Sequence, residues 1–186
     1  MSDFLNKYAA VAGEDVIQHL QQLAAPLEGL KVVHVNSTRV GGGVAEILDK
    51  MVPMMASLGL DVQWEVITGE PDFYQCTKSF HNGLQGMPVD VSLHLRKAYE
   101  TTNEQLAEQH RELLTEADIV IIHDPQPAPL LKYIPNRKGK WIWRCHIDAS
   151  RPYRPVWKYL REFVSGYDGS IFSLVNFAQI LPHPQT

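Results

Sequence analysis

A chain of 186 residues, 45% of them hydrophobic, is long enough to fold as one domain that buries about 70% of its unfolded surface. Its formal net charge of -4 and its scattered lysines and arginines argue against nucleic acid as the main partner. No apolar run approaches the ~20 residues that a membrane span needs, so no membrane partner is expected.

Strand-like and helix-like patterns alternate along the chain. β-Branched and aromatic runs predict strands at 31–36, 62–67, 119–122, 141–144 and 170–174. Apolar residues at helical spacing predict helices at 14–25, 45–58 and 156–164, a long polar helix over 91–114, and a short helix with a loop over 72–84. This order predicts one Rossmann-like domain over 1–186, an α/β fold with a doubly wound, mostly parallel sheet and helices on both faces.

Three consecutive glycines lie between the strand at 31–36 and the helix that follows it. Gly41, Gly42 and Gly43 leave the unpaired N–H groups and the positive dipole end of that helix uncovered by side chains. A sugar hydroxyl or a phosphate could therefore approach the backbone closely. The structural alternative is that glycine only lets the helix and the strand pack tightly.

Two better-known glycine loops do not fit this spacing. A dinucleotide fingerprint that starts at Gly41 would need its third glycine where Glu46 stands. A P-loop would need Gly-Lys-Ser or Gly-Lys-Thr, whereas Gly43 is followed by Val44. The loop is therefore not expected to bind a nicotinamide cofactor or to cleave a nucleoside triphosphate.

Polar residues follow two of the predicted strands at their carboxyl ends, which is where open parallel sheets bind ligands. His123, Asp124 and Gln126 follow one strand, and His146 and Asp148 follow the next. Together they would supply a carboxylate for sugar hydroxyls, an amide and a titratable imidazole. Each has a structural alternative, because the aspartates could hold turns and His123 could be a hydrogen-bonded core residue. The other histidines considered are expected to be structural or exposed: His19, His34, His94, His110 and His183.

A metal site built from His123, Asp124, His146 and Asp148 is a further alternative, since these residue types bind divalent ions. The spacing contains neither a His-x-x-x-His helix nor a four-cysteine pattern. Neighbouring strand residues such as His123 and Asp124 also point to opposite faces. A metallohydrolase is therefore disfavoured, and no metal is expected.

Several long motifs resemble one known family. They are the runs at 34–48 (HVNSTRVGGGVAEIL), 64–69, 73–86, 120–128 (VIIHDPQPA), 143–148 (WRCHID) and 167–172. Together they resemble the amino-terminal domain of trehalose synthases of the glycosyltransferring type. These are retaining, two-domain GT-B glycosyltransferases of family 4, near the trehalose phosphorylases.

The resemblance implies transfer of glucose from a nucleotide-activated donor to free glucose, giving trehalose with the donor's α configuration retained. The amino-terminal domain would hold the acceptor, with Gly42 and Gly43 lining the reaction centre and Asp124 and Gln126 binding acceptor hydroxyls. His146 would lie near the transferred sugar, which makes His146 and Gly43 the candidate catalytic residues. Three further residues in matching motifs are expected to face the cleft: Arg39, Lys78 and Asn82.

The same resemblance requires a second, donor-binding domain that these 186 residues do not supply. We therefore expect a domain that is inactive alone, with no cofactor, since the nucleotide-glucose is a co-substrate of the missing domain. The expected partners are glucose or trehalose, a donor-binding domain or subunit, and a second copy of the chain. The alternatives are a stand-alone sugar-binding or regulatory module and a trehalose phosphorylase-like domain.

The cysteines and the amino terminus indicate where the protein is found. Cys76 and Cys145 do not form a Cys-x-x-Cys pair. The first residues lack a basic region followed by a long apolar run. A cytoplasmic protein with free thiols is therefore predicted.

Overall fold

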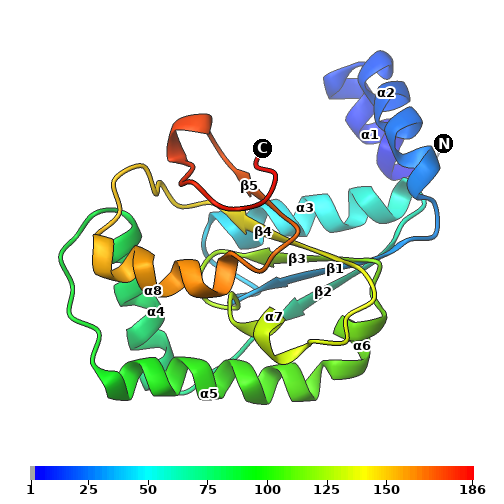
Figure 1. Ribbon diagram of the computed structural model, residues 1–186. Helices are drawn as coiled ribbons and strands as arrows, with labels where there is room; N and C mark the ends of the chain where they lie inside the picture. The colour runs from blue at the N-terminus through cyan, green and yellow to red at the C-terminus, as the bar shows by residue number, and fades with distance from the viewer. Residues whose placement is uncertain (1–2) are drawn as a thin grey trace.

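The computed structural model describes residues 3–186, which form one parallel sheet with helices on both sides (Figure 1). The strand order is β2-β1-β3-β4-β5. The strands are β1 (Lys31–Asn36), β2 (Asp61–Val66), β3 (Ile119–His123), β4 (Lys140–Cys145) and β5 (Gly169–Phe172). The predicted doubly wound α/β fold is confirmed, and the neighbouring strands all pair in parallel. The order reverses between β1 and β3, the switch point at which sheets of this order bind ligands.

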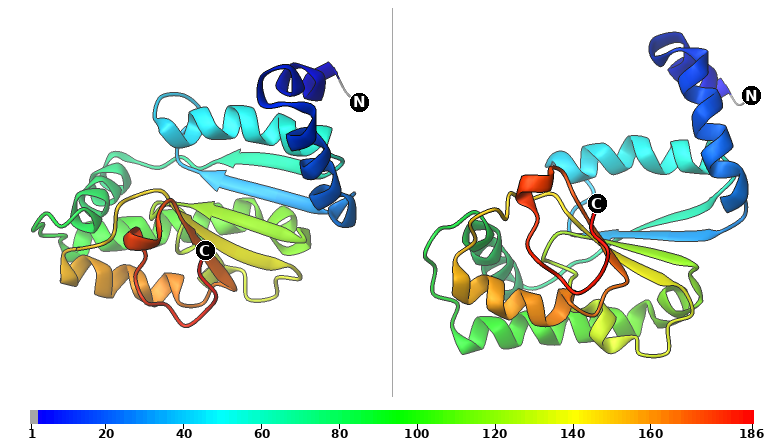
Figure 2. Two further views of the ribbon diagram at one scale, coloured as in Figure 1. Left: turned by 90° about the horizontal axis from the view of Figure 1, so that it is seen from above. Right: turned by 45° about the horizontal axis from the view of Figure 1, so that its top comes forward.

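Helices fill the connections between the strands. No helix within residues 3–186 has the length and apolar composition that crossing a bilayer needs. Figure 2 shows α1 and α2 at the end of the sheet opposite to the arrowheads, far from the carboxyl ends of the strands. The helices are α1 (Asp3–Ala12), α2 (Glu14–Ala24), α3 (Gly43–Ser57), α4 (Pro71–Leu84), α5 (Leu93–Gln109), α6 (Arg111–Glu116), α7 (Leu130–Tyr133) and α8 (Arg154–Val164), with short 3-10 turns at Ala25–Leu27 and Val175–Phe177.

The two faces of the sheet bury different amounts of apolar surface. Successive strand residues point to opposite faces, so Val33 joins the large core on the side of α4, α5 and α8, while Val32 joins a small cluster with Leu60. Met55 of α3 packs against that smaller cluster. In Figure 1, α3 lies on one side of the sheet and α5 on the other. His34, like Val32, lies on the α3 side and is fully buried there.

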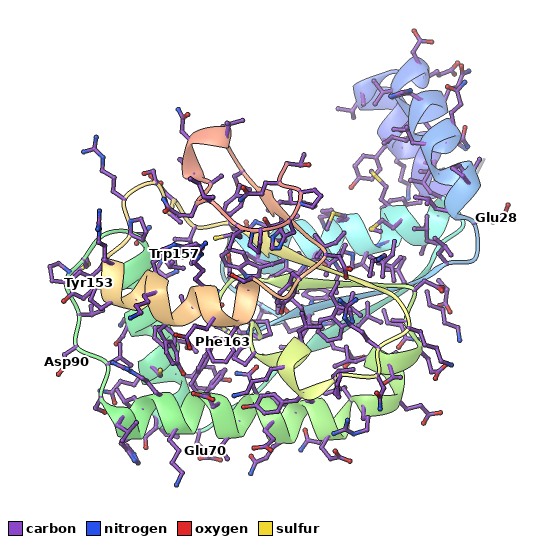
Figure 3. All side chains as sticks on the ribbon, in the orientation of Figure 1. Glu28, Glu70, Asp90, Tyr153, Trp157 and Phe163 are labelled. Atoms are coloured by element: carbon purple, nitrogen blue, oxygen red, sulfur yellow. The ribbon has the colours of Figure 1, made fainter. Side chains whose placement is uncertain are left out.

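Aromatic side chains fix α8 against the sheet and against α5. Trp157 and Phe163 are marked on α8 in Figure 3. The ring of Trp157 lies 6.4 Å from that of Trp143 on β4, and the ring of Phe163 lies 6.1 Å edge-on from that of Tyr99 on α5. Trp143 and Tyr99 are fully buried. The strand that leads to His146 is therefore held rigidly from the large-core side.

The structure differs from the predicted elements in four helical regions. The segment at 72–84 is one continuous helix that begins with Pro71 in its first turn, not a short helix and a loop. The predicted helix over 91–114 divides at His110, whose backbone (φ -106°, ψ 14°) ends α5 and precedes α6. The helices α1 and α7 were not predicted from the sequence.

Gly83 lies inside α4 at a point where this helix approaches α8 closely. A Cβ at Gly83 would lie 2.7 Å from Cγ2 of Val156, closer than real Cβ atoms come. We expect Gly83→Ala to lower the free energy of unfolding by about 1 kcal/mol, since the overlap outweighs the helical preference of alanine. Urea denaturation in the wild-type and Val156→Ala backgrounds checks this. The penalty should shrink when Val156 is shortened, because Cγ2 at 2.7 Å is removed while Cβ at 3.0 Å stays, and an equal penalty in both backgrounds would contradict the contact.

Candidate functional site

The glycine loop connects the end of β1 with the start of α3. Gly41 and Gly42 have φ values of +75° and +100°, which favour glycine, whereas Gly43 has no positive φ. A Cβ on any of the three would meet no atom within 4 Å in residues 3–186. Tight packing of helix against strand therefore does not explain Gly43. The space beside the three glycines at the start of α3 is therefore open, and a ligand could fill it.

Side chains at the end of β1 and on β2 hold the first half of this loop. Asn36 accepts a hydrogen bond from Nε1 of Trp64 at 2.8 Å and donates one to the carbonyl of Thr38 at 2.8 Å. The guanidinium of Arg39 lies 4.1 Å from the centre of the Trp64 ring, a cation–π contact. The exposed Arg39 is thus held against β2 beside the glycine loop.

Asp124 joins the ends of β3 and β4 through three hydrogen bonds. Its amide donates to the carbonyl of Arg144 at 2.9 Å, and its own carbonyl accepts from Nε1 of Trp143 at 2.9 Å. Its carboxylate accepts the backbone N–H of His146 at 2.7 Å. Asp124 also has φ +63° and is the only residue other than glycine with a positive φ within residues 3–186. The expected proximity of Asp124 and His146 is confirmed, and the carboxylate of Asp124 bonds to the segment after β4, not to a turn at Pro125.

Burial controls the charges at this edge. The pKa of Asp124 is raised to about 6 by burial, against the opposing effects of the His146 amide and the Arg144 charge. Burial and Arg144 lower the pKa of His146 to about 4. At pH 7 the edge therefore presents a carboxylate and a neutral imidazole.

Three histidines form a hydrogen-bonded row across the sheet. Nδ1 of His34 lies 3.0 Å from Nε2 of His123, and Nδ1 of His123 lies 2.9 Å from Nε2 of His146. Their ring centres are 5.3 and 5.2 Å apart along the row, with the rings stacked. His123 is the hydrogen-bonded core residue that the structural alternative describes, and His34 is buried as expected. The sequence analysis missed that both connect to His146.

A signal for this row exists in the sequence. Each histidine lies at or near the carboxyl end of one of three adjacent strands, on the face that α3 covers. Finding it requires the strand register, because 89 residues separate His34 from His123.

The remaining candidate residues are less closely joined to this pair. The carbonyl of Gln126 accepts a hydrogen bond from Nδ2 of Asn103 at 3.1 Å, and its side chain is half-buried. Lys78 is exposed and Asn82 half-buried on α4, and within residues 3–186 neither side chain contacts Asp124 or His146 through a hydrogen bond or ion pair. Asp148 is exposed and accepts the amide of Ser150 at 2.9 Å, so its turn-holding alternative is correct.

The arrangement gives little support to a metal site or to a cysteine nucleophile. Within residues 3–186, no group of three or more His, Cys, Asp or Glu side chains could hold a metal ion. Both cysteines are buried free thiols, and burial raises the pKa of Cys76 to about 12. Neither thiol is an activated nucleophile.

The family model of the trehalose synthase N-terminal domain matches residues 34–179. The chain belongs to this family. The matched span includes the glycine loop, Asp124 and all three histidines of the row. The resemblance seen in the sequence motifs is therefore confirmed.

The chain is similar in sequence to trehalose synthases and, more distantly, to trehalose phosphorylases. It is 44% identical to the trehalose synthase of Thermococcus litoralis over 176 residues, which are 94% of this chain and 42% of that protein. It is 40% identical to the trehalose synthase of Rubrobacter xylanophilus, covering 91% of this chain and 41% of that protein. A trehalose phosphorylase of Pleurotus pulmonarius is 27% identical over 85% of this chain and 24% of its own length. The chain thus spans about two fifths of these trehalose synthases.

Solved structures show the same fold. An α,α-trehalose-phosphate synthase (UDP-forming) from Burkholderia xenovorans, solved with glucose-6-phosphate, has a TM-score of 0.59 at 17% identity over 79% of this chain and 41% of that chain. A trehalose-6-phosphate structure from E. coli with UDP-2-fluoro glucose has a TM-score of 0.61 at 18% identity over 78% and 40%. These are GT-B glycosyltransferases, and the likeness extends to the fold alone.

Proposed function

We propose that this domain binds the sugar acceptor of a retaining glycosyltransferase that forms trehalose from a nucleotide-activated glucose and free glucose. The donor would be bound by a second domain outside these 186 residues, and the chain alone would not catalyse transfer. The observation that carries this proposal is the meeting of Asp124 and His146 at the edge of the sheet that also bears the open glycine loop. Membership of the trehalose synthase family supports the choice of substrates.

The chemistry proposed needs positioning rather than a protein nucleophile. The Asp124 carboxylate and the Gln126 amide would accept and donate hydrogen bonds to acceptor hydroxyls. The amides at Gly42 and Gly43 and the His146 ring would lie against the transferred sugar. The leaving phosphate of the donor can accept the acceptor's proton, while oriented donors stabilise the charge that develops.

Titration of the purified chain with glucose, trehalose and a nucleotide-glucose tests the assignment. We expect glucose or trehalose to bind with a Kd no better than about millimolar, because half of the enclosing surface is missing. Asp148→Asn is the control variant and should not change sugar binding, since this exposed carboxylate lies near the same edge but holds only its own turn. Micromolar binding of the nucleotide-glucose with no response to glucose would overturn the domain assignment, as would steady turnover by the chain alone.

Gly43 offers a variant that separates ligand binding from folding. Its φ is not positive and a Cβ there would meet nothing within 4 Å. We therefore expect Gly43→Val to change the free energy of unfolding by less than about 0.5 kcal/mol. The same variant should weaken glucose binding about tenfold by blocking close approach to the α3 amides. Thermal unfolding and NMR titration measure the two effects, and unchanged glucose binding would remove Gly43 from the site.

A further inference from the structure

The row of His34, His123 and His146 runs from the interior of the sheet to the candidate site. His34 is fully buried on β1, His123 is 2% exposed at the end of β3, and His146 is half-buried just beyond β4. Both hydrogen bonds of the row have the same sense, since each joins Nδ1 of one ring to Nε2 of the next. The row therefore has a direction.

That direction links the protonation of all three rings. A neutral imidazole carries one N–H and one acceptor nitrogen, and each hydrogen bond needs one of each. If Nδ1 of His34 donates, Nε2 of His123 accepts, so the proton of His123 is on Nδ1 and faces Nε2 of His146. The proton of His146 must then also be on Nδ1. The reverse arrangement places all three protons on Nε2.

The surroundings keep the three rings neutral. Burial lowers the pKa of His34 to about 4 and lowers the pKa of His123 further, and the Arg144 charge acts in the same direction on His123 and His146. The carboxylate of Asp124 accepts the backbone amide of His146, and the ring nitrogens inside the row pair with one another. A neutral row with one shared tautomer follows.

The inner end of the row favours one of the two arrangements. Nε2 of His34 is buried and has no hydrogen-bond partner within residues 3–186. A proton there would create a buried N–H without an acceptor, and such orphaned N–H groups are rarer than unpaired acceptors. Protons on Nδ1 leave only a lone pair at this end. At the outer end, the partly exposed His146 then carries an N–H on Nδ1, the ring nitrogen that the row leaves for a ligand.

We propose that His34 and His123 are positioning residues that hold His146 as the Nδ1–H tautomer, so that His146 offers a hydrogen-bond donor to a ligand oxygen. The identity of that oxygen as a sugar hydroxyl rests on the proposed function. The shared tautomer does not, because the row is complete within this chain.

Long-range proton–nitrogen NMR of the histidine rings tests the proposal on the purified chain at pH 7. We expect all three rings to show a protonated Nδ1 and an unprotonated Nε2, whereas the exposed His19 should show an average of the two tautomers. His123→Leu removes the partner of Nε2 of His146, and we expect the His146 signals to move to the average pattern. His19→Asn is the matched control and should leave His146 unchanged. A protonated Nε2 on any ring of the row, or an unchanged His146 in His123→Leu, would overturn the proposal.

Two further measurements keep the proposal distinct from the proposed function. If His123→Leu does not fold, His34→Asn serves instead, since its amide can replace the Nδ1–H donor and should preserve the His146 tautomer. Loss of the Nδ1–H tautomer in that rescue variant would also overturn the proposal. Added glucose should shift the Nδ1 signal of His146 without moving its proton to Nε2. A shared Nδ1–H tautomer with no glucose response would support the row and count against the sugar site.

Discussion

Lowering the pH from 7 to 4 is expected to reduce the free energy of unfolding of this domain by about 4 kcal/mol. The cause is the row of buried histidines. The pKa of His34 is lowered from an ordinary 6.5 to about 4, and burial lowers that of His123 further. Between these values the unfolded chain binds more protons than the folded one, so stability is complete above pH 6.5 and is lost as the pH falls towards 4. His34 alone corresponds to about 3 kcal/mol.

Asp124 opposes this loss of stability, so its contribution enters the net change in the free energy of unfolding. Its pKa is raised from 3.8 to about 6, so its folded form takes up a proton first as the pH falls. Stability from this group therefore grows between pH 6 and 4, by about 2 to 3 kcal/mol. His123 and the partly exposed His146 together outweigh that gain, the latter discounted for solvent screening. The net loss stays close to that of His34 and part of His123.

Urea denaturation at pH 7, 6, 5 and 4 measures the slope. His34→Asn should flatten it by about three quarters, and the remaining histidines should still contribute the rest. His19→Asn is the matched control, since this exposed ring should not alter the profile. A free energy of unfolding that stays constant between pH 7 and 5 would show that the row is not held neutral by the fold.

The sheet could be predicted well because its strands carry their own pattern. The run at 31–36 is apolar and β-branched, and β1 begins and ends there. The rule that ligands bind at carboxyl ends of parallel strands then predicted that Asp124 and His146 would meet. Both inferences use only local composition and the chain order.

The features that the sequence did not predict correctly depend mostly on contacts between distant segments. The place of Gly83 inside α4 matches the close approach of Val156, which no local pattern records. The helix breaks at His110, although the long polar stretch around it has residues that favour one continuous helix. The link from His34 to His146 depends on which face each residue occupies and on the register of three strands. A shift of one residue in any strand would have placed a ring on the opposite face.

Asp124 allows the fold and the proposed chemistry to be separated with three substitutions. Asp124→Ala is expected to lower the free energy of unfolding by about 2 to 4 kcal/mol. Alanine disfavours the φ of +63°, and it removes the acceptor of the His146 amide. Asp124→Gly should recover the part due to φ but not the part due to the hydrogen bond. Asp124→Asn should be at least as stable as the wild type at pH 7, because asparagine tolerates this backbone, keeps an oxygen for the amide and removes a buried charge.

Acceptor use then reports on the carboxylate itself. In a protein that includes the donor domain, Asp124→Ala should weaken acceptor use by about 2 to 4 kcal/mol of transition-state stabilisation and leave donor binding almost unchanged. Asp124→Asn should lose acceptor use while keeping its stability, which a role in holding the turn alone would not produce. Kinetics against both substrates measure this, and normal acceptor use in Asp124→Asn would reduce the residue to a turn anchor.

The asparagine variant also links the two predictions. Without the carboxyl that takes up a proton near pH 6, the opposing gain on acidification disappears. The loss of stability between pH 7 and 4 should therefore grow by about 2 to 3 kcal/mol in Asp124→Asn. An Asp124→Asn profile parallel to that of the wild type would show that burial does not raise the pKa of this carboxyl. In that case the carboxyl of Asp124 would be ionised in the folded protein without the raised pKa that burial is expected to cause.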